Sequence, residues 1–193
     1  MNEAHEAGTL LISYSEEVHK SSQVFLDSWL PSKTLHTQVA WLSVHNPRSA
    51  KSEDKSSFQH SLSSEWSKIC AEGRSTLSEV DKLAEQFDIL SGKWLVFVSP
   101  DEVDNLWGQI VESTLAGTIG SSATVSTRKE GHPRHLICVS NADYRSVEEV
   151  NSVRDELRQL GVIKRIAYKP DIYTYCGIYN GNSWGIPPSL YVV

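Results

Sequence analysis

Residues 93–117 read KWLVFVSPDEVDNLWGQIVESTLAG, and this stretch predicts a buried strand that leads directly into a helix. The first seven residues (93–99) are almost continuously apolar, as expected of a central strand. A complete helix start follows, with an N-cap, a proline at the first helical position and a capping-box partner in Ser99, Pro100 and Glu102. An apolar stripe at helical spacing extends from Val103 to Leu115, and Gly117 ends the helix.

Similar signals predict further elements on both sides of this unit. Helices are expected over residues 13–30, 58–73, 76–87 and 146–160. Strands are expected over residues 37–45, 123–128, 135–140 and in pieces of the tail 162–193. This order favours an α+β fold with a mixed or antiparallel sheet and helices on one face. We expect one domain (1–193), with a flexible N-terminus (1–12) and a mobile loop (46–57).

Composition and cysteine usage indicate a soluble protein of a reducing compartment. The chain has 193 residues, of which 39% are hydrophobic and 22% charged, so a single sizeable core is expected. It contains no run of eighteen apolar residues, and its acidic start does not resemble a signal peptide. The three cysteines, Cys70, Cys138 and Cys176, are far apart. We expect no membrane association and a cytoplasmic location, although the sequence does not separate cytoplasm from nucleus.

The charge is distributed unevenly along the chain. The net charge is −6, but residues 1–117 contain nine Lys/Arg against seventeen Asp/Glu, whereas residues 118–193 contain nine against seven. An anionic ligand is therefore expected to prefer the C-terminal part. Solvated faces without any role explain a difference of this size equally well.

Enzymatic signals are mostly absent from the sequence. Motifs for phosphate loops, dinucleotide binding, serine hydrolases and zinc proteases do not occur. His132 and His135 would point to opposite faces of a hairpin, which disfavours a metal site. Cys138, in an alternating apolar strand, is expected in the core rather than as a nucleophile. We therefore expect a binding protein with no catalytic residue, cofactor or metal.

The C-terminal part is rich in aromatic residues. Four of the seven tyrosines lie within residues 168–179, and Trp184 follows. On a strand, Tyr173, Tyr175 and Tyr179 could not all be buried, so amphipathic rings next to basic side chains would suit a base or a phosphate. Tyrosine is also a good strand former, and surface hydroxyls would explain the same pattern.

Several segments resemble a known family. They are LSGKW (90–94), HLICV (135–139) and above all YKPDIYTYCGIY (168–179), followed by Asn182 and Trp184. These residues are similar to the basophilic leukaemia-expressed protein family, whose members are uncharacterised. The resemblance implies a fold like that of the cap-binding translation initiation factor 4E, with a curved antiparallel sheet and helices on its convex face.

A direct resemblance to the initiation factor is visible in the GKWLV strand, the helix with Trp107 and the hairpin residues Ser126 to Arg128. It implies that Arg128 matches a phosphate-binding arginine, with Arg134 as a second cation. The tryptophan sandwich for methylguanine has no counterpart, because residues 83–90 read LAEQFDIL without a Trp-Glu pair. Cap binding of the usual kind is therefore not expected. Trp41, Trp94 and Trp107 lie on apolar stripes and are expected in the core.

Three functional hypotheses follow. The first is a non-enzymatic RNA- or nucleotide-binding domain that uses the concave sheet face. Its phosphate candidates are Arg128, Lys129, Arg134 and Lys169, and its base candidates are Asp171, Tyr173, Tyr175 and Trp184. The second is an adaptor that binds a protein partner on the helical face near Trp66. The third is an enzyme with a site around Cys138, Asp171 and Tyr173.

Overall fold

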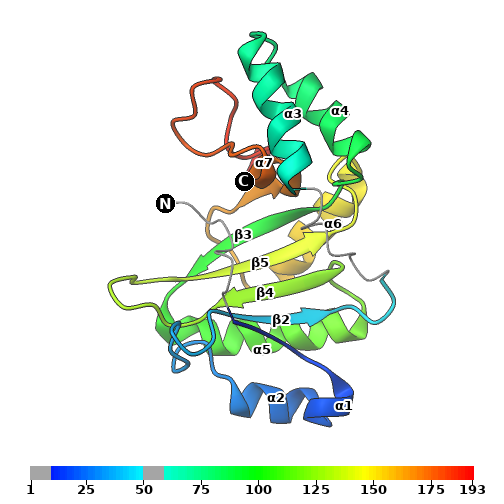
Figure 1. Cartoon of the computed structure of the whole chain (residues 1–193). Helices are drawn as coiled ribbons and strands as arrows, with labels where there is room; N and C mark the ends of the chain where they lie inside the picture. The colour runs from blue at the N-terminus through cyan, green and yellow to red at the C-terminus, as the bar shows by residue number, and fades with distance from the viewer. Residues whose placement is uncertain (1–9, 50–58) are drawn as a thin grey trace.

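The computed structural model describes residues 10–49 and 59–193, which build a seven-stranded sheet with helices (Figure 1). The strand order is β1-β2-β4-β5-β3-β6-β7. The strands are β1 (Leu11–Ser13), β2 (Trp41–His45), β3 (Gly92–Val98), β4 (Ser122–Ser126), β5 (His135–Asn141), β6 (Ala167–Pro170) and β7 (Tyr191–Val192). Neighbouring strands are antiparallel except at one edge, where β1 is parallel to β2. The predicted α+β class is confirmed.

The central strand and its helix form as the sequence predicts. β3 pairs with β5 along its whole length, and α5 (Pro100–Ala116) follows immediately. Ser99 Oγ donates to Glu102 Oε2 at 2.8 Å, and the Ser99 N–H reaches the same oxygen at 3.4 Å, which completes the capping box. Gly117 ends α5 with a φ of 74°, a left-handed conformation that favours glycine. This unit fixes the direction of the whole sheet.

The helices lie in two groups, one packed around α5 against the sheet and the other beyond β3. Contacts place α5 against β2, β4 and β5, α6 (Val147–Gln159) against β5, and α2 (Ser22–Ser28) against α5. α1 (Glu16–His19) precedes α2, so the predicted helix at 13–30 is two short helices that separate at Lys20. Figure 1 shows α3 (Gln59–Ala71) and α4 (Leu77–Gln86) beyond β3, with α7 (Asp171–Tyr175) at their base. No helix within the described ranges is long and apolar enough to cross a membrane.

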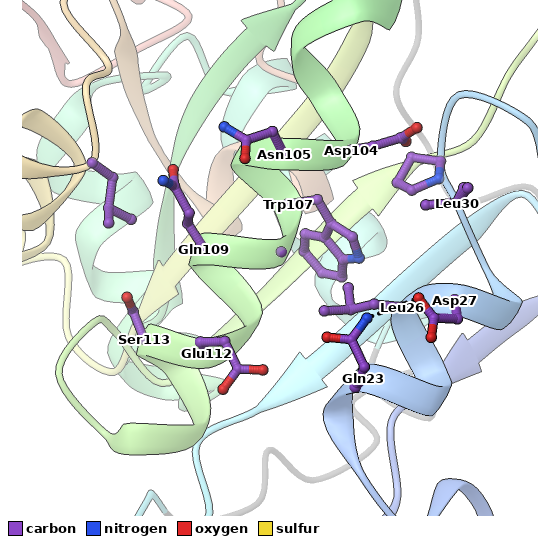
Figure 2. Close-up of a pocket in the computed structure, with 13 residues that line it drawn as sticks. Gln23, Leu26, Asp27, Leu30, Asp104, Asn105, Trp107, Gln109, Glu112 and Ser113 are labelled. Atoms are coloured by element: carbon purple, nitrogen blue, oxygen red, sulfur yellow. Dashed lines mark hydrogen bonds between the residues drawn. The ribbon is translucent and has the colours of Figure 1, made fainter.

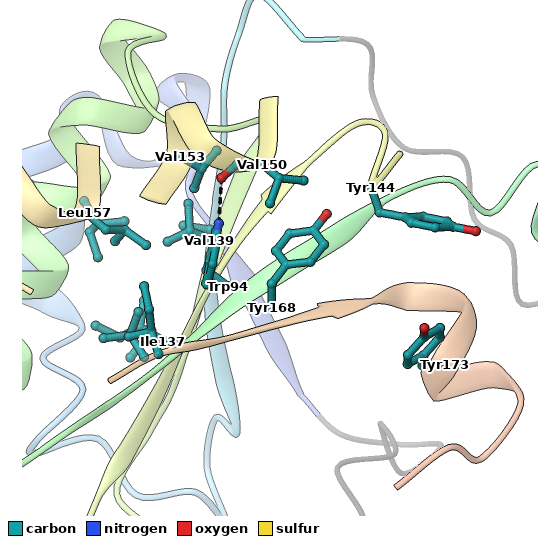
Figure 3. Close-up of a cluster of buried hydrophobic side chains, with 14 of the residues drawn as sticks. Trp94, Ile137, Val139, Tyr144, Val150, Val153, Leu157, Tyr168 and Tyr173 are labelled. Carbon is teal, nitrogen blue, oxygen red and sulfur yellow. Dashed lines mark hydrogen bonds between the residues drawn. The ribbon is translucent and has the colours of Figure 1, made fainter. Parts of the chain in front are cut away.

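The main core lies on the face of the sheet that α5 and α6 cover, and it extends to buried residues of α3, α4 and α7. Trp94 and Trp107 are buried there, as predicted, and the Trp94 indole N–H donates to the Val150 carbonyl at 2.9 Å (Figure 3). Alternation along the strands sends every second side chain to this face, which we call the helix face. The prediction that Trp41 lies in this core is corrected, because its side chain points to the opposite face and packs with Leu95 and Cys138.

Three segments depart from the sequence-based boundaries. The strand expected over 37–45 begins at Trp41. The expected flexible N-terminus and mobile loop fall largely on residues 1–9 and 50–58, outside the described residues; within the described part, Leu11 begins β1 and Asn46 is buried. The tyrosine-rich segment is the clearest correction, because Asp171–Tyr175 is a helix rather than a strand.

Candidate nucleic-acid interface

The sheet face opposite α5 and α6, called the open face below, presents three rows of side chains that run across the strands. The strand register fixes these rows because directly opposite residues point to the same side. The first row consists of Trp41, Ser126, Leu136 and Phe97. The second consists of Ser43, Thr124, Cys138, Leu95 and Ala167. The third consists of His45, Ser122, Ser140, Lys93 and Lys169.

The first row forms one end of the open face, and this end is aromatic. Phe97 is 43% exposed, and the Arg134 guanidinium carbon lies 5.3 Å from the centre of its ring. This distance is typical of a cation–π contact. Trp41 is half-buried at the other end of the row and packs with Leu95, Leu136 and Cys138. Arg134 also precedes β5, so the β4–β5 hairpin supplies positive charge at this end.

The third row forms the opposite end of the open face and contains two lysines. Lys93 Nζ lies 3.0 Å from Asp171 Oδ1, and Ser91 Oγ donates to Asp171 Oδ2 at 2.6 Å. Lys169 is 4% exposed, and its Nζ lies 3.6 Å from the centre of the Tyr179 ring. Lys93 and Lys169 thus lie side by side at this end, with Asp171 and the hydroxyls of the same row next to them.

The two ends are separated by the length of β3. Lys93 and Phe97 are four residues apart on one strand, which corresponds to about 13 Å. The middle row between them carries mostly small or hydroxyl side chains, and Ser13 and Ser43 share a hydrogen bond of 2.5 Å between their Oγ atoms. One end of the face is thus aromatic and the other contains two lysines, whereas Ser43, Cys138 and Leu95 between them are 1%, 6% and 8% exposed.

The structure does not gather all of the predicted ligand residues at one place. Arg128, Lys129 and Arg134 are exposed at the β4–β5 hairpin, near the Phe97 end. Lys169 and Asp171 lie at the opposite end of the face, where β6 leads into α7. The predicted convergence of the hairpin cations with the C-terminal rings is therefore wrong.

Three of the predicted aromatic residues are packed rather than available for stacking. Tyr173 is 3% exposed within the main core (Figure 3), and burial raises the pKa of its hydroxyl to about 12. Trp184 packs edge-on against Trp66, with ring centres 5.1 Å apart, and Trp66 itself is 4% exposed. Tyr175 is half-buried against the core. The Trp66 side chain, expected at a partner surface, is therefore packed inside the chain instead.

A separate cleft lies on the helix side, between α2 and α5 (Figure 2). It encloses about 640 Å³ over an apolar floor that includes Leu26 and Trp107. Its acidic lining consists of Asp27, Asp104 and Glu112, and neither Lys nor Arg is found among its lining residues within the described chain. Asp104 is fixed by Ser32, whose N–H donates at 2.9 Å and whose hydroxyl donates at 2.5 Å.

Metal-binding side chains do not gather in the part of the chain that the structure describes, where no three of His, Cys, Asp and Glu form a cluster. His135 is buried and its Nδ1 lies 2.8 Å from the Ser126 carbonyl, so the imidazole is occupied by the backbone. Cys138 lies on the open face, whereas Tyr173 lies in the core on the helix face. Tyr173 therefore lies away from Cys138 and Asp171, so the three residues considered for an enzyme are not assembled at one place.

Comparison with known proteins assigns the chain to a family. The family model described as basophilic leukemia-expressed protein Bles03 matches residues 51–177, which is roughly two-thirds of the chain. The chain belongs to the Bles03 family. The matched region includes β3, α5, the β4–β5 hairpin and α7, and so it contains most of the open face.

Solved structures with a similar arrangement are cap-binding proteins. A C. elegans eIF4E-3 in complex with the 4E-binding protein Mextli and a cap analog is 17% identical, with a TM-score of 0.38 over 44% of this chain and 52% of that one. Ascaris suum eIF4E-3 with m2,2,7G cap is 15% identical, with a TM-score of 0.41 over 55% and 59%. A schistosome eIF4E with m7GpppA and 4E-BP is 17% identical, with a TM-score of 0.43 over 53% and 58%. This Bles03-family chain thus spans little more than half the length of these proteins.

Sequence reasoning missed two open-face residues of this Bles03-family chain, Lys93 and Phe97. Both were assigned to a strand buried on both faces because KWLVFVS is nearly all apolar. The signal that could have identified them is the alternation of side chains along a strand. Lys93, Leu95 and Phe97 share one face, and a lysine is seldom fully buried.

Proposed function

We propose that this chain is a non-enzymatic protein that binds a nucleotide or a short stretch of RNA on the open face of its sheet. The observation that supports this proposal is the register of β3, which places the Phe97–Arg134 pair and the Lys93–Lys169 pair at opposite ends of one surface. A base stacks at the first pair, and phosphate groups approach the second through Lys93, whose side chain is 22% exposed. We also propose a cytoplasmic location, since all three cysteines are free thiols.

The chemistry of the two ends supports this ligand class. An aromatic ring accepts any base on its face, and an arginine beside it adds a cation–π contribution. Lysine ammonium groups attract phosphate as point charges. The distance of about 13 Å along β3 exceeds a single base, so the ligand is a nucleotide with an extended phosphate chain or two to three linked nucleotides.

Binding without catalysis is supported by what lies between the two ends. The middle row offers hydroxyls and the Cys138 thiol, and Asp171, the carboxylate beside it, is engaged by Lys93 and Ser91. General acid–base chemistry needs a group poised near the reacting bond. Hydroxyls in this position instead suit hydrogen bonds to sugar or phosphate oxygens.

The test is the binding of short capped and uncapped RNA at two salt concentrations, measured by fluorescence anisotropy. We expect affinity to fall steeply with salt, because phosphate contacts release counterions. Lys93→Ala should weaken binding and reduce the salt slope by about one, and Phe97→Ala should weaken binding with little change in slope. Arg154→Ala, on α6 at the other side of the sheet, is the matched control. Binding that ignores salt and both open-face substitutions would refute the proposal.

A second candidate function is an adaptor for a protein partner, located at the α2–α5 cleft rather than at Trp66. It is favoured by the acidic lining of an apolar cleft, which suits an amphipathic helix with Lys or Arg along its edge. A synthetic helix of this kind should bind the wild-type chain and lose affinity in Glu112→Lys, while RNA binding is unchanged. Equal affinity for both chains would count against this adaptor role.

A further inference from the structure

A second cavity, which we call the edge cavity, lies where β3 leaves the sheet. It encloses about 410 Å³ between three elements: the C-terminal half of β3, the first turns of α5 and the segment 160–166 that links α6 to β6. This size is within the usual range of small-molecule sites. Its floor is formed by Val96 and Val98, whose side chains point to the helix face, and it meets the open face at Phe97.

The cavity exists because β6 stops pairing before β3 ends. The last paired residues are Leu95 and Ala167. Ile166 instead exchanges hydrogen bonds with Val193, and within the described chain no backbone hydrogen bond joins Phe97 to residues 163–166. Arg158 holds this segment in place, since its guanidinium donates to the carbonyls of Val162 and Lys164. The opening is thus maintained by specific contacts.

The lining combines an apolar interior with a small polar group. Its buried members are Val96, Val98, Leu106, Val162 and Ile166. Asn105 and Gln109, one turn apart on the same side of α5, supply two carboxamides that donate and accept hydrogen bonds. Phe97 and Ile163 lie at the rim, 43% and 84% exposed, so large apolar surface already faces solvent here.

The charges at this cavity cancel, in contrast to the open face. Two acids, Asp101 and Glu102, and two bases, Lys164 and Arg165, line it. Lys164 Nζ lies 3.0 Å from Glu102 Oε2, so one pair is already neutralised at the rim. An ion would gain no net attraction and would lose hydration over an apolar floor. An uncharged ligand avoids that cost.

We propose that the edge cavity binds an uncharged small molecule with an apolar body and one amide or hydroxyl group. The body occupies the space between β3, Leu106 and Ile166, and the polar group hydrogen-bonds to Asn105 and Gln109. The edge cavity shares Phe97 with the open face but none of its charged residues, so its uncharged ligand does not depend on the cations proposed to bind RNA.

Three probes of similar shape test the proposal in the full chain: N-benzylacetamide (uncharged), benzylamine (cationic) and phenylacetate (anionic). Each is titrated against isotope-labelled protein, and backbone amide shifts are followed by NMR. We expect saturable shifts from N-benzylacetamide at residues 96–98 and 162–166, with millimolar affinity as befits a fragment. The charged probes should bind roughly tenfold more weakly, because each buries a charge.

Two surface variants show whether the shifts come from this cavity. Asn105→Ala removes one carboxamide, and Ile163→Asp places a charge at the rim; both residues are exposed, so folding is retained. Asn105 also lines the α2–α5 cleft, so Ile163→Asp is the variant specific to the edge cavity. Each should weaken N-benzylacetamide binding severalfold, whereas Val18→Asp, at a 73% exposed site on α1, should not. Shifts that are absent from residues 96–98 and 162–166, equal for the three probes or unchanged in both variants would overturn the proposal.

Discussion

Lys93 lies directly opposite Lys169 in the antiparallel pair of β3 and β6. Like charges in this position normally destabilise a sheet. Here each ammonium group has its own neighbour: Asp171 lies 3.0 Å from Lys93, and the Tyr179 ring lies 3.6 Å from Lys169. The sheet therefore holds two lysines side by side, an arrangement that is costly for stability and that an anionic ligand would favour.

Asp171→Asn should separate these two effects. Removal of the carboxylate leaves the lysines opposed and Ser91 without its charged acceptor, so we expect the free energy of unfolding to fall by about 1–3 kcal/mol. RNA affinity should rise by roughly two- to fivefold, because the open face gains one positive charge. Urea denaturation and anisotropy titrations measure the two quantities.

Asp155→Asn is the control for this experiment. Asp155 is exposed on α6, and its ion pair with Arg154 lies at the surface, so stability and RNA binding should change little. Lower stability with unchanged RNA affinity in Asp171→Asn would mean that the phosphate groups bind elsewhere.

Trp66→Ala should act through folding rather than through a partner. Trp66 is 4% exposed and packs against Trp184, so truncation leaves a large cavity between α3 and the C-terminal segment. We expect a loss of about 3–5 kcal/mol in the free energy of unfolding. Thermal and urea denaturation check this value. His60→Ala, exposed on the same helix, should be nearly neutral, and an unchanged stability of Trp66→Ala would show that the indole is not part of the core.

Local sequence signals predicted the elements whose ends are marked by side-chain chemistry. Thr76 and Ser146 cap α4 and α6 as expected, and each accepts a hydrogen bond from the third residue of its helix. The segment after Pro170 was mistaken for a strand because tyrosine and isoleucine favour strands. Its burial follows a helical pattern instead, with Ile172, Tyr173 and Cys176 inward. Tertiary packing thus decided between two local preferences of similar strength.

The candidate site was only partly accessible from the sequence, for a geometric reason. Residue type identified Lys169 and Arg134 as cations, but their position depends on register, which no local signal reports. The pairs Lys93–Lys169 and Leu136–Phe97 arise from strands about 40 to 80 residues apart. Aromatic content was also misleading, because Tyr168 and Tyr173 fill the core.

Stability should decrease at alkaline pH, first through Cys176. Burial, with a smaller contribution from Cys70, raises the pKa of the Cys176 thiol from 9.0 to about 12. Below pH 9 the thiol is protonated in both states and its contribution is fully present. Between pH 9 and 12 the unfolded chain loses this proton first, so the free energy of unfolding falls by up to about 1.4 kcal/mol per pH unit.

Two variants separate the contributions of Cys176 and Tyr173 within this pH range. Cys176→Ala should flatten the decline from pH 9 upward. Tyr173→Phe should flatten it only above pH 10, since burial raises the pKa of the Tyr173 hydroxyl from 10.0 to about 12. Urea denaturation under reducing conditions, from about pH 8 to about pH 11, measures each slope. A slope that is the same in wild type and Cys176→Ala would show that the thiol does not titrate as a buried group.

Gly92→Ala should be among the most damaging single-methyl changes in the sheet. A Cβ at this position would collide with the Tyr168 hydroxyl and ring. Tyr168 is fully buried, and its hydroxyl donates to Asn141 Oδ1 at 2.6 Å, so the ring cannot move without breaking a buried hydrogen bond. Overpacking and the lost bond together should cost about 2–5 kcal/mol in the free energy of unfolding.

Gly108→Ala is the matched control, because a Cβ there meets only Leu26 at 3.8 Å and lies within α5. Helix propensity predicts that this change is neutral or stabilising by about 0.5–1 kcal/mol. Since Gly92 begins the strand that carries both ends of the open face, Gly92→Ala should also weaken RNA binding, whereas Gly108→Ala should not. Equal stability of the two variants would mean that Tyr168 is not fixed as the structure places it.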